Sequence, residues 1–400
     1  MLATANSRKL HAELWKRLET FLYANYENPD IGAVKVMFAV VAAHRITDYP
    51  PAWLLVIAPS GSMKTEILRA LEGLPSIHFV DEVTESTFIS GKFDEPGKNK
   101  QSHPASLLHR IGKEGILVAA DFSTYIAMDK KQQSKVLAQL RRIYDGQFSR
   151  EFGTAENLNE RMWKGRLTML AGATPAIDRQ YSIGQALGER FVKVRCPRAG
   201  GVQVGLRAIS KPESVALELK QHVRAVLYPV LSCGATEVPR IPVEYLTRIA
   251  KLGEFGSLAR AYVPRDRYTR KIDGLAAPEG NTRLPQQLAQ IGRGWALIEG
   301  RGEINSSDYG LIRRAAWDCI PYDRRQVMEA LLGGKPPYST GLPPAVTDRA
   351  LEDLEAVGLV SKDEQAVIIV KPEYRLSDTA KELLDDERIS RNFYPDEERE

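Results

Sequence analysis

The chain has 400 residues, 43% of them hydrophobic and 26% charged, with a formal net charge of +4. Its length and composition indicate a globular protein of two or three domains. No apolar stretch reaches the roughly 18 residues that a membrane-spanning helix needs, so we expect no membrane partner. Cys196, Cys233 and Cys319 lack CxxC spacing. They predict buried thiols in a reducing compartment, not a metal site or a disulfide framework.

Two helices are predicted between residues 7 and 46. Leucines recur every four residues from Leu10 to Leu22, and a second apolar stripe begins at Val34. The sequence Asn-Pro-Asp at 28–30 marks the turn between the two stripes. We therefore expect residues 1–48 to form an N-terminal helical segment.

Five short apolar runs then predict strands, with helical patterns between most of them. Strands that alternate with helices indicate the α/β class and a parallel sheet, which we expect within residues 49–200. The predicted strands are 54–57, 77–80, 116–120, 167–171 and 191–194.

The sequence LLVIAPSGSMKT at residues 54–65 places a small-residue turn between the first strand and a helix. In a phosphate-binding loop (P-loop), the N–H groups of the turn and the helix N-terminus face the β-phosphate. A lysine such as Lys64 supplies positive charge, and a hydroxyl such as that of Thr65 binds Mg²⁺. We therefore expect ATP and Mg²⁺ at this turn. The candidate nucleotide-binding residues are Ala58, Pro59, Ser60, Gly61, Ser62, Met63, Lys64 and Thr65.

The turn departs from the P-loop motif GxxxxGK[ST] at two positions. Ala58 and Met63 stand where the motif has glycine, while Gly61 lies inside the turn. A Cβ at Met63 is placed where backbone must approach phosphate closely. The alternative is an ordinary strand-to-helix turn that ends in Lys-Thr.

Asp121 follows the buried run 116–120. An acid at the end of a strand beside the P-loop strand is the second group that organises Mg²⁺ in such sites. Phe122 comes next, where many ATPases have the glutamate that orients water, so no catalytic base is visible. The alternative interpretation of Asp121 is a helix N-cap.

Two further polar residues flank the last two predicted strands. Thr174 is placed to hydrogen-bond a γ-phosphate or an attacking water, or it simply ends a strand before a proline. Arg190 opens the last strand. It is either a charge-stabilising finger for the ATP of a neighbouring subunit or a surface salt-bridge residue.

The C-terminal half has a different order of predicted elements. Residues 201–320 are mostly helical in pattern, residues 321–384 have the element order of a winged helix, and residues 385–400 form a charged tail. The expected elements of the winged helix are a helix at 324–332, a helix at 345–357 and a hairpin through 365–370 and 374–376.

Charge varies along this half of the chain. The basic stretch from Arg260 to Lys271 is interpreted as the end of a lid helix, or as a solvated face. The second helix of the winged-helix region is acidic, and this face would repel phosphate. Its acidic residues are Asp348, Glu352, Asp353 and Glu355.

The ordered set of motifs resembles the ATPase core of AAA+ proteins. Within that class it is most similar to the minichromosome maintenance (MCM)-type helicases and their relatives in phages and mobile elements. The motifs are APSGSMKT, ILVAADFSTY, LAGATPAIDRQY, LGERF and TRLPQQL, within residues 50–318. The resemblance implies an AAA+ P-loop parallel sheet with a helical lid and a C-terminal winged-helix-like domain. By position it implies Lys64 and Thr65 as the Walker A pair, Asp121 as the Walker B acid, Thr174 as sensor 1, Arg190 as the arginine finger and Arg283 as sensor 2.

The resemblance also implies two segments that contact nucleic acid. An insertion after Ser90 would line a central pore and place lysines on phosphates. A pore hairpin between Tyr144 and Lys164 mixes aromatic and basic residues, as single-strand-binding surfaces do. The alternative for both segments is a solvated surface loop. The candidate DNA-binding residues are Lys92, Lys98, Lys100, Phe148, Arg150, Arg161 and Lys164.

These features predict an ATP hydrolase that assembles as a homo-oligomeric ring, a hexamer by resemblance. We expect it to move single-stranded DNA in the replication of a phage or mobile element, in the cytoplasm of a bacterial or phage-infected cell. A primase or loader protein is a further candidate partner. The first alternative is an ATP-dependent switch or loader that binds DNA and recruits a partner without unwinding. The second is a non-motor P-loop enzyme such as a small-molecule kinase.

Overall fold

The computed structural model describes residues 5–84, 86–89, 106–122, 125, 128–154, 157–179, 189–233, 237–363 and 373–384. The chain divides into two compact units. The first is Met1–Arg240 with Gln290–Asp308, and the second is Ile241–Ala289 with Tyr309–Glu400. The division into five parts that the sequence suggests stays a prediction.

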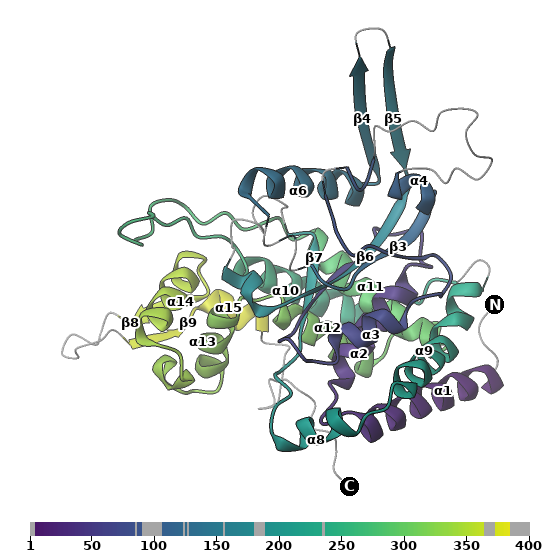
Figure 1. Ribbon diagram of the computed structural model, residues 1–400. Helices are drawn as coiled ribbons and strands as arrows, with labels where there is room; N and C mark the ends of the chain where they lie inside the picture. The colour runs from purple at the N-terminus through teal and green to yellow at the C-terminus, as the bar shows by residue number, and fades with distance from the viewer. Residues whose placement is uncertain are drawn as a thin grey trace. The chain divides into compact units, whose positions relative to one another are not determined.

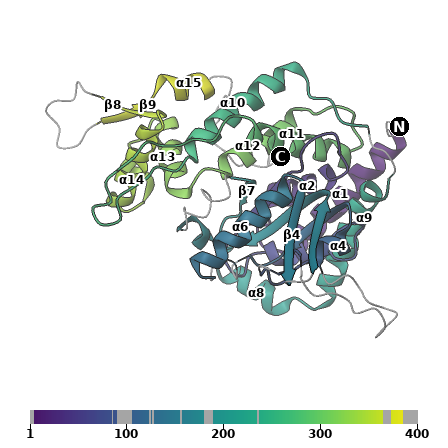
Figure 2. The same ribbon diagram turned by 90° about the horizontal axis from the view of Figure 1, so that it is seen from above.

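The first unit is built on a five-stranded parallel sheet with the strand order β2-β3-β6-β1-β7 (Figures 1 and 2). The predicted α/β class and all five predicted strands are confirmed. The strands are β1 (Trp53–Ile57), β2 (Ile77–Phe79), β3 (Glu114–Ala119), β6 (Arg166–Ala173) and β7 (Phe191–Arg195).

One expectation about this sheet is wrong. The strand that leads to Asp121 is β3, and it does not pair with β1, because β6 lies between the two. Pairing between strands more than a hundred residues apart depends on the whole packed sheet, and the local apolar pattern does not encode it.

Helices cover the sheet, and a hairpin extends from it (Figure 1). The hairpin is antiparallel and is formed by β4 (Gln147–Thr154) and β5 (Asn157–Lys164), where the resemblance implies one. The helices are α1 (Ala5–Asn25), α2 (Ile31–Ala43), α3 (Lys64–Ala70), α4 (Leu107–Ile111), α6 (Lys130–Tyr144), α8 (Val202–Ser210) and α9 (Ser214–Ser232), with a 3₁₀ turn η1 at Pro175–Arg179.

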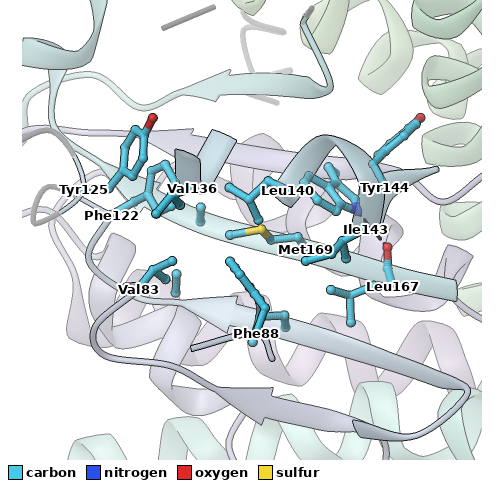
Figure 3. Close-up of a cluster of buried hydrophobic side chains, with 14 of the residues drawn as sticks. Val83, Phe88, Phe122, Tyr125, Val136, Leu140, Ile143, Tyr144, Leu167 and Met169 are labelled. Atoms are coloured by element: carbon cyan, nitrogen blue, oxygen red, sulfur yellow. Dashed lines mark hydrogen bonds between the residues drawn. The ribbon is translucent and has the colours of Figure 1, made fainter. Parts of the chain in front are cut away.

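A hydrophobic cluster fills the space between one face of the sheet and α6 (Figure 3). Alternate residues of a strand point to the same face, so Leu167 and Met169 of β6 meet Leu140 and Ile143 of α6. The indole Nε1 of Trp53 in β1 donates to the Leu167 carbonyl oxygen at 2.7 Å, which satisfies the one polar atom of this buried ring.

α2 packs against β1, β6 and β7 and is buried along almost its whole length. It begins where the side chain of Asp30 accepts a hydrogen bond from the Ala33 amide at 3.0 Å, and its residues are nearly all apolar. A Cβ at Gly294, in α11 (Arg283–Ile298), would lie 1.9 Å from the Ala39 carbonyl oxygen. Glycine at 294 is therefore required for α11 to approach α2 this closely.

The aromatic residues near α2 are also buried. Trp15 of α1 makes an edge-to-face contact with Trp295 at a centroid distance of 4.8 Å, and the ammonium of Lys35 lies 5.4 Å from both indole rings. All five tryptophans of the chain are buried, namely Trp15, Trp53, Trp163, Trp295 and Trp317.

The second unit is mainly helical and has a core that includes Phe255, Trp317 and Leu351. Two helices are followed by an antiparallel strand pair, in the predicted order, but the predicted strand at 365–370 lies outside the described residues. The elements are α10 (Val243–Ala259), α13 (Tyr322–Leu332), the 3₁₀ turn η2 (Pro337–Thr340), α14 (Pro344–Ala356), β8 (Val360–Asp363), β9 (Glu373–Leu376) and α15 (Asp378–Leu384). α11 and α12 (Ser306–Asp318) contribute residues to both units.

The acidic face of α14 is paired within its own unit. Arg265 contacts Glu352 and Asp353 at 2.7 Å each, Arg324 contacts Asp353 at 3.0 Å, and Lys362 contacts Glu355 at 2.8 Å. Basic residues distant in sequence therefore pair with three of the four carboxylates, and Asp348 accepts a hydrogen bond from Tyr338 Oη at 2.5 Å. The repulsion of phosphate by this face stays a prediction.

Two smaller expectations also differ from the structure. The stretch that begins at Arg260 is not the end of a helix, because α10 ends at Ala259 and residues 262–277 fold into a hairpin. None of the cysteines forms a disulfide, and Cys319 is buried as expected, but Cys196 is only half-buried and Cys233, the C-cap residue of α9, is exposed.

Candidate functional site

The turn between β1 and α3 lies at the edge of the sheet where the parallel strands end. Its backbone reverses through Gly61, whose φ of +76° suits glycine, and the Ser62 amide donates to the Pro59 carbonyl oxygen at 3.3 Å. α3 begins at Lys64 without a side-chain cap. A small-residue turn followed by an uncapped helix is therefore present where the sequence predicts a P-loop.

Lys64 lies across the end of β6. Its side chain is buried, and its Nζ atom is 3.4 Å from the Ala173 carbonyl oxygen. A Cβ at Gly172 would lie 2.5 Å from the Ala120 carbonyl oxygen and 3.2 Å from Lys64 Cδ, so a side chain at 172 would displace the lysine. Burial lowers the pKa of Lys64, while the nearby Asp121 carboxylate raises it. The ammonium is thus held close to an acid at the same edge of the sheet.

The ends of β1, β6 and β3 bring three predicted residues to this edge. Thr174 follows β6 and is half-buried, and Asp121 follows β3 and is exposed. The loops are joined by backbone hydrogen bonds, from the Ala58 amide to the Ala173 carbonyl at 3.0 Å and from the Phe122 amide to the Gly172 carbonyl at 2.6 Å. Because β6 is the middle strand, Thr174 comes between the strand ends that carry Lys64 and Asp121.

The turn forms one wall of a cavity of about 240 Å³. Gly61, Ser62, Met63 and Lys64 line it, whereas Thr65 does not and is only half-buried beside it. Ser62 Oγ is buried and has no hydrogen-bond partner among the described residues. A buried hydroxyl without a partner is rare in folded proteins and fits a site built for an absent polar ligand.

The cavity has a polar wall and an apolar wall. Lys64 and Arg198 contribute positive charge, while Ala33, Val34 and Met37 of α2 contribute apolar surface. Such a pocket suits a ligand with an anionic end and a flat apolar end.

Polar contacts connect α3 to the segments on either side of the cavity. Tyr26 Oη donates to the Glu66 carboxylate at 2.6 Å, and Lys211 pairs with the same carboxylate while its Nζ lies 3.9 Å from the centroid of the Tyr26 ring. Burial, together with the Glu66 carboxylate, raises the pKa of Tyr26. Arg207 of α8 pairs with Glu27 at 2.8 Å. The four residues Tyr26, Glu27, Arg207 and Lys211 all line the cavity.

Arg198, Arg207 and Lys211 are cavity residues that the sequence analysis misses. The available signal is the sequence Pro-Arg-Ala-Gly-Gly at 197–201, a turn-forming run directly after a buried strand. Because this run follows the parallel strand β7, it lies at the carboxyl ends of the strands, which is also where the P-loop turn lies. No comparable signal marks Arg207 and Lys211, which reach the cavity from a helix and its end.

Arg190 lies at the opposite edge of the sheet from Lys64. In the register of β7 with β1, Phe191 is level with Trp53 and Arg195 is level with Ile57. At ~3.3 Å per strand residue, about 16 Å along the strands separates Arg190 from the level of Ile57, which directly precedes the turn. Its guanidinium is buried, pairs with Asp145 at 3.1 Å and lies 5.5 Å from the centroid of the Tyr144 ring.

Arg283 opens α11, as predicted, and pairs with Glu279 at 3.3 Å. It belongs to the second unit and Lys64 to the first. Its assignment as sensor 2 stays a prediction.

The structure describes only some of the predicted DNA-binding residues. Lys92, Lys98 and Lys100 lie outside the described residues, and Arg150 and Arg161 are described by backbone alone, as opposite positions of the β4–β5 register. Lys164, at the end of β5, is exposed.

Phe148 does not fit the expected base-stacking role. It is 6% exposed and, with its cross-strand partner Trp163, packs in the hydrophobic core beneath the hairpin. The aromatic and basic residues of this hairpin therefore differ in exposure: Phe148 and Trp163 are buried, whereas Lys164 faces solvent.

Within the described ranges, no group of three or more His, Cys, Asp or Glu residues is arranged to hold a metal ion. The assignment of Thr65 and Asp121 as magnesium ligands stays a prediction. No described helix is long and apolar enough to span a bilayer. No protein-family profile matches the chain, and no curated protein matches it at a significant level.

Proposed function

We propose that this chain is an AAA+ ATPase, and the observation that carries the proposal is the order β1-β6-β3 at one edge of the sheet. This order puts Lys64, Thr174 and Asp121 at the ends of three successive strands. These are the residue types that hold a β-phosphate, contact a γ-phosphate and organise a metal ion. The adjacent cavity and the unpartnered Ser62 hydroxyl support a ligand at this edge.

The residues divide the work of binding between them. The amides of the turn and the Lys64 ammonium hold the phosphates, while the apolar side chains of α2 that line the cavity accept the flat base. Thr65 and Asp121 hold Mg²⁺, which neutralises charge that develops on the phosphates during transfer. Burial of Lys64 strengthens its interaction with an anion, because little water screens it.

We propose that ATP is shared between subunits of a ring, a hexamer by resemblance. The support is the register of β7 with β1, which holds Arg190 too far from the turn of its own chain to act there. In this assembly Arg190 stabilises charge on the ATP of the neighbouring subunit. A guanidinium supplied in this way accelerates hydrolysis about 10³-fold or more.

The proposed work of the ring is movement of single-stranded DNA during replication of a phage or mobile element. Changes in subunit packing during the ATP cycle would move the segment around Lys92 and the β4–β5 hairpin along the strand. The antiparallel hairpin between residues 147 and 164 supports this proposal, because it stands where the resemblance expects a pore hairpin. The helix-helix-hairpin order of residues 322–376 is compatible with the winged-helix-like domain.

A second candidate function is an ATP-dependent switch or loader that does not unwind DNA. Phe122 favours it, because this side chain is buried and stacks on Tyr125 at a centroid distance of 4.7 Å (Figure 3). The residue after Asp121 therefore supplies no carboxylate to orient water, which predicts slow hydrolysis. An unwinding assay on a forked duplex separates the two candidates, since only the motor releases the displaced strand.

The experiment that tests nucleotide binding compares Lys64→Ala with Lys113→Ala. Lys113 is exposed at the other edge of the same sheet, so its variant controls for loss of one positive charge. We expect calorimetry with ATP and Mg²⁺ to show binding by the parent and by Lys113→Ala, and none by Lys64→Ala. Equal binding of ATP by all three proteins would contradict the assignment of this turn as a P-loop.

A further inference from the structure

The segment between α10 and α11 folds back on itself as a hairpin in the second unit (Figure 1). We define it as the 262–277 hairpin. Antiparallel bridges join Tyr262 to Ala277 and Arg265 to Ile272. The Asp266 amide donates to the Lys271 carbonyl oxygen at 2.9 Å and closes the tip.

Arg265 fixes the base of this tip to α14. Its guanidinium contacts Asp353 at 2.7 Å and Glu352 at 2.7 Å, and Nη1 also donates to the Arg270 carbonyl oxygen at 2.8 Å. A bidentate guanidinium with two carboxylates is a geometrically specific anchor. The tip is therefore presented on a support and is not a loose loop.

The tip, residues 267–271, carries three basic side chains and one exposed aromatic ring. Tyr268 is 87% exposed, and Arg267, Arg270 and Lys271 are exposed as well. None of these three cations has a side-chain ion pair within the described part of the chain.

The acidic residue next to the tip, Asp266, makes hydrogen bonds within the turn. The carboxylate of Asp266 accepts hydrogen bonds from the Thr269 amide at 2.6 Å, from the Thr269 hydroxyl at 2.8 Å and from the Tyr268 amide at 3.0 Å. These contacts shape the turn and lower the pKa of Asp266. The charge that the tip presents is positive.

Arg270 occupies a backbone conformation that arginine rarely adopts. Its φ is +61°, at the position of a hairpin loop where glycine or asparagine is favoured. The Arg270 side chain makes no described contact that offsets this strain. When an exposed residue keeps an unfavourable backbone conformation and its side chain makes no stabilising contact, the side chain is a candidate for a functional role.

We propose that the tip of the 262–277 hairpin binds single-stranded nucleic acid. The three basic side chains contact successive phosphates, and the face of the Tyr268 ring stacks on a base. Cations placed around an exposed aromatic ring are the combination that single-strand-binding surfaces use. The site is separate from the segments that the resemblance assigns to a pore.

The first test measures binding of a fluorescent oligothymidylate to the full chain without nucleotide. We expect Tyr268→Ala to weaken binding about fivefold or more, which is the loss of one base-stacking contact. Tyr322→Ala is the matched control, because Tyr322 is an exposed tyrosine of the same unit outside the hairpin. A Tyr268→Ala protein that binds as tightly as the Tyr322→Ala protein would overturn the proposal.

The second test uses Arg270→Gly, which removes a charge and also relieves the backbone strain. We expect this variant to unfold at a temperature no lower than the parent, so weaker binding cannot come from misfolding. We also expect the slope of log affinity against log salt concentration to fall in magnitude by about 0.7, the value for one lost phosphate contact on a single strand. An unchanged slope would overturn the assignment of Arg270.

The third test separates this site from other surfaces that bind DNA. Photocrosslinking of a bromodeoxyuridine oligonucleotide, followed by mass spectrometry, should place a crosslink on Tyr268 and none on Tyr322. Displacement of the crosslink by polyglutamate but not by unlabelled oligothymidylate would identify an acidic protein as the partner and overturn the proposal. Lys64→Ala should retain the crosslink, so failure of the nucleotide site is distinguishable from failure of this one.

Discussion

Arg190 and Asp145 form an ion pair with a nitrogen-to-oxygen distance of 3.1 Å, at the edge of the sheet opposite Lys64. Arg190 is buried, whereas the Asp145 side chain is 51% exposed. The pair therefore orients a buried guanidinium with a carboxylate that faces solvent.

If Arg190 serves a neighbouring subunit, its loss should slow hydrolysis without loss of ATP binding. We expect Arg190→Ala to reduce the turnover of ATP about 10³-fold, with an unchanged dissociation constant in calorimetry. Asp145→Asn is the matched control. It should reduce turnover much less, because water screens the exposed carboxylate and its contribution is small.

Mixing the two inactive variants tests the shared site directly. In a mixture of Lys64→Ala and Arg190→Ala subunits, some interfaces combine an intact Lys64 with an intact Arg190. We expect the mixture to hydrolyse ATP faster than either variant alone. A mixture no faster than its components would contradict service between subunits.

Gly172→Ala should impair the nucleotide site through the position of Lys64. The added Cβ would lie 2.5 Å from the Ala120 carbonyl oxygen and 3.2 Å from Lys64 Cδ. We expect a loss of about 1–3 kcal/mol in the free energy of unfolding and a rise in the dissociation constant for ATP. Gly310→Ala, in α12, meets nothing within 4 Å and should stabilise the chain by up to about 1 kcal/mol, with ATP binding unchanged.

His44 should make the stability of the first unit depend on pH. Burial, together with Arg166 and Arg45, lowers its pKa from 6.5 to about 3. Below pH 6.5, His44 is protonated in the unfolded chain, whereas in the folded chain it stays neutral down to a pH near 3. The free energy of unfolding should therefore fall by about 1.4 kcal/mol per pH unit as the pH decreases toward 3.

Urea denaturation at pH 7.5 and pH 5.5 measures this dependence. His44→Asn should show a smaller difference between the two pH values than the parent, although it will be less stable because the 3.1 Å contact to Thr168 Oγ1 changes. His109→Asn, which alters an exposed histidine, should keep the difference of the parent. An equal difference in all three proteins would exclude His44 as its source.

Arg324 should be essential for the stability of the second unit. It is 2% exposed, and it donates to the carbonyl oxygens of Ala259 and Ala261 at 3.0 and 2.6 Å while it pairs with Asp353. Arg324→Ala leaves these acceptors buried, and we expect a loss of about 3–5 kcal/mol in the free energy of unfolding.

Arg349→Ala is the control for Arg324. Arg349 lies on the exposed side of α14, so its replacement should change the free energy of unfolding by less than about 0.5 kcal/mol. Thermal unfolding of the two variants measures the difference. A small effect of Arg324→Ala would mean that water replaces the guanidinium.

Local patterns predict the elements of the first unit well. The five strands are short and mostly apolar, and β1 and most of β3 are buried, so runs such as 116–120 identify them from the sequence. The turn that leads to Lys64 is visible for a similar reason, because its small residues and the helix after it are contiguous. The hairpin at 147–164 required the resemblance, because its strands mix apolar, aromatic and basic residues.

Contacts between distant residues are what the sequence does not show. The insertion of β6 between β1 and β3, the burial of Phe148 and the approach of Lys211 to Glu66 each depend on segments more than ten residues apart. The sequence identifies the tip at 267–271 only as part of the basic stretch from Arg260 to Lys271. Its hairpin has isolated bridges and lacks the alternating apolar pattern that identifies a strand.

The burial of all five tryptophans gives the chain a built-in optical reporter. Trp317 belongs to the second unit, and the other four indoles belong to the first. Replacement of Trp317 by phenylalanine would leave an emission spectrum that reports on the first unit alone. Comparison with the parent protein would then reveal whether the two units melt in one transition or in sequence.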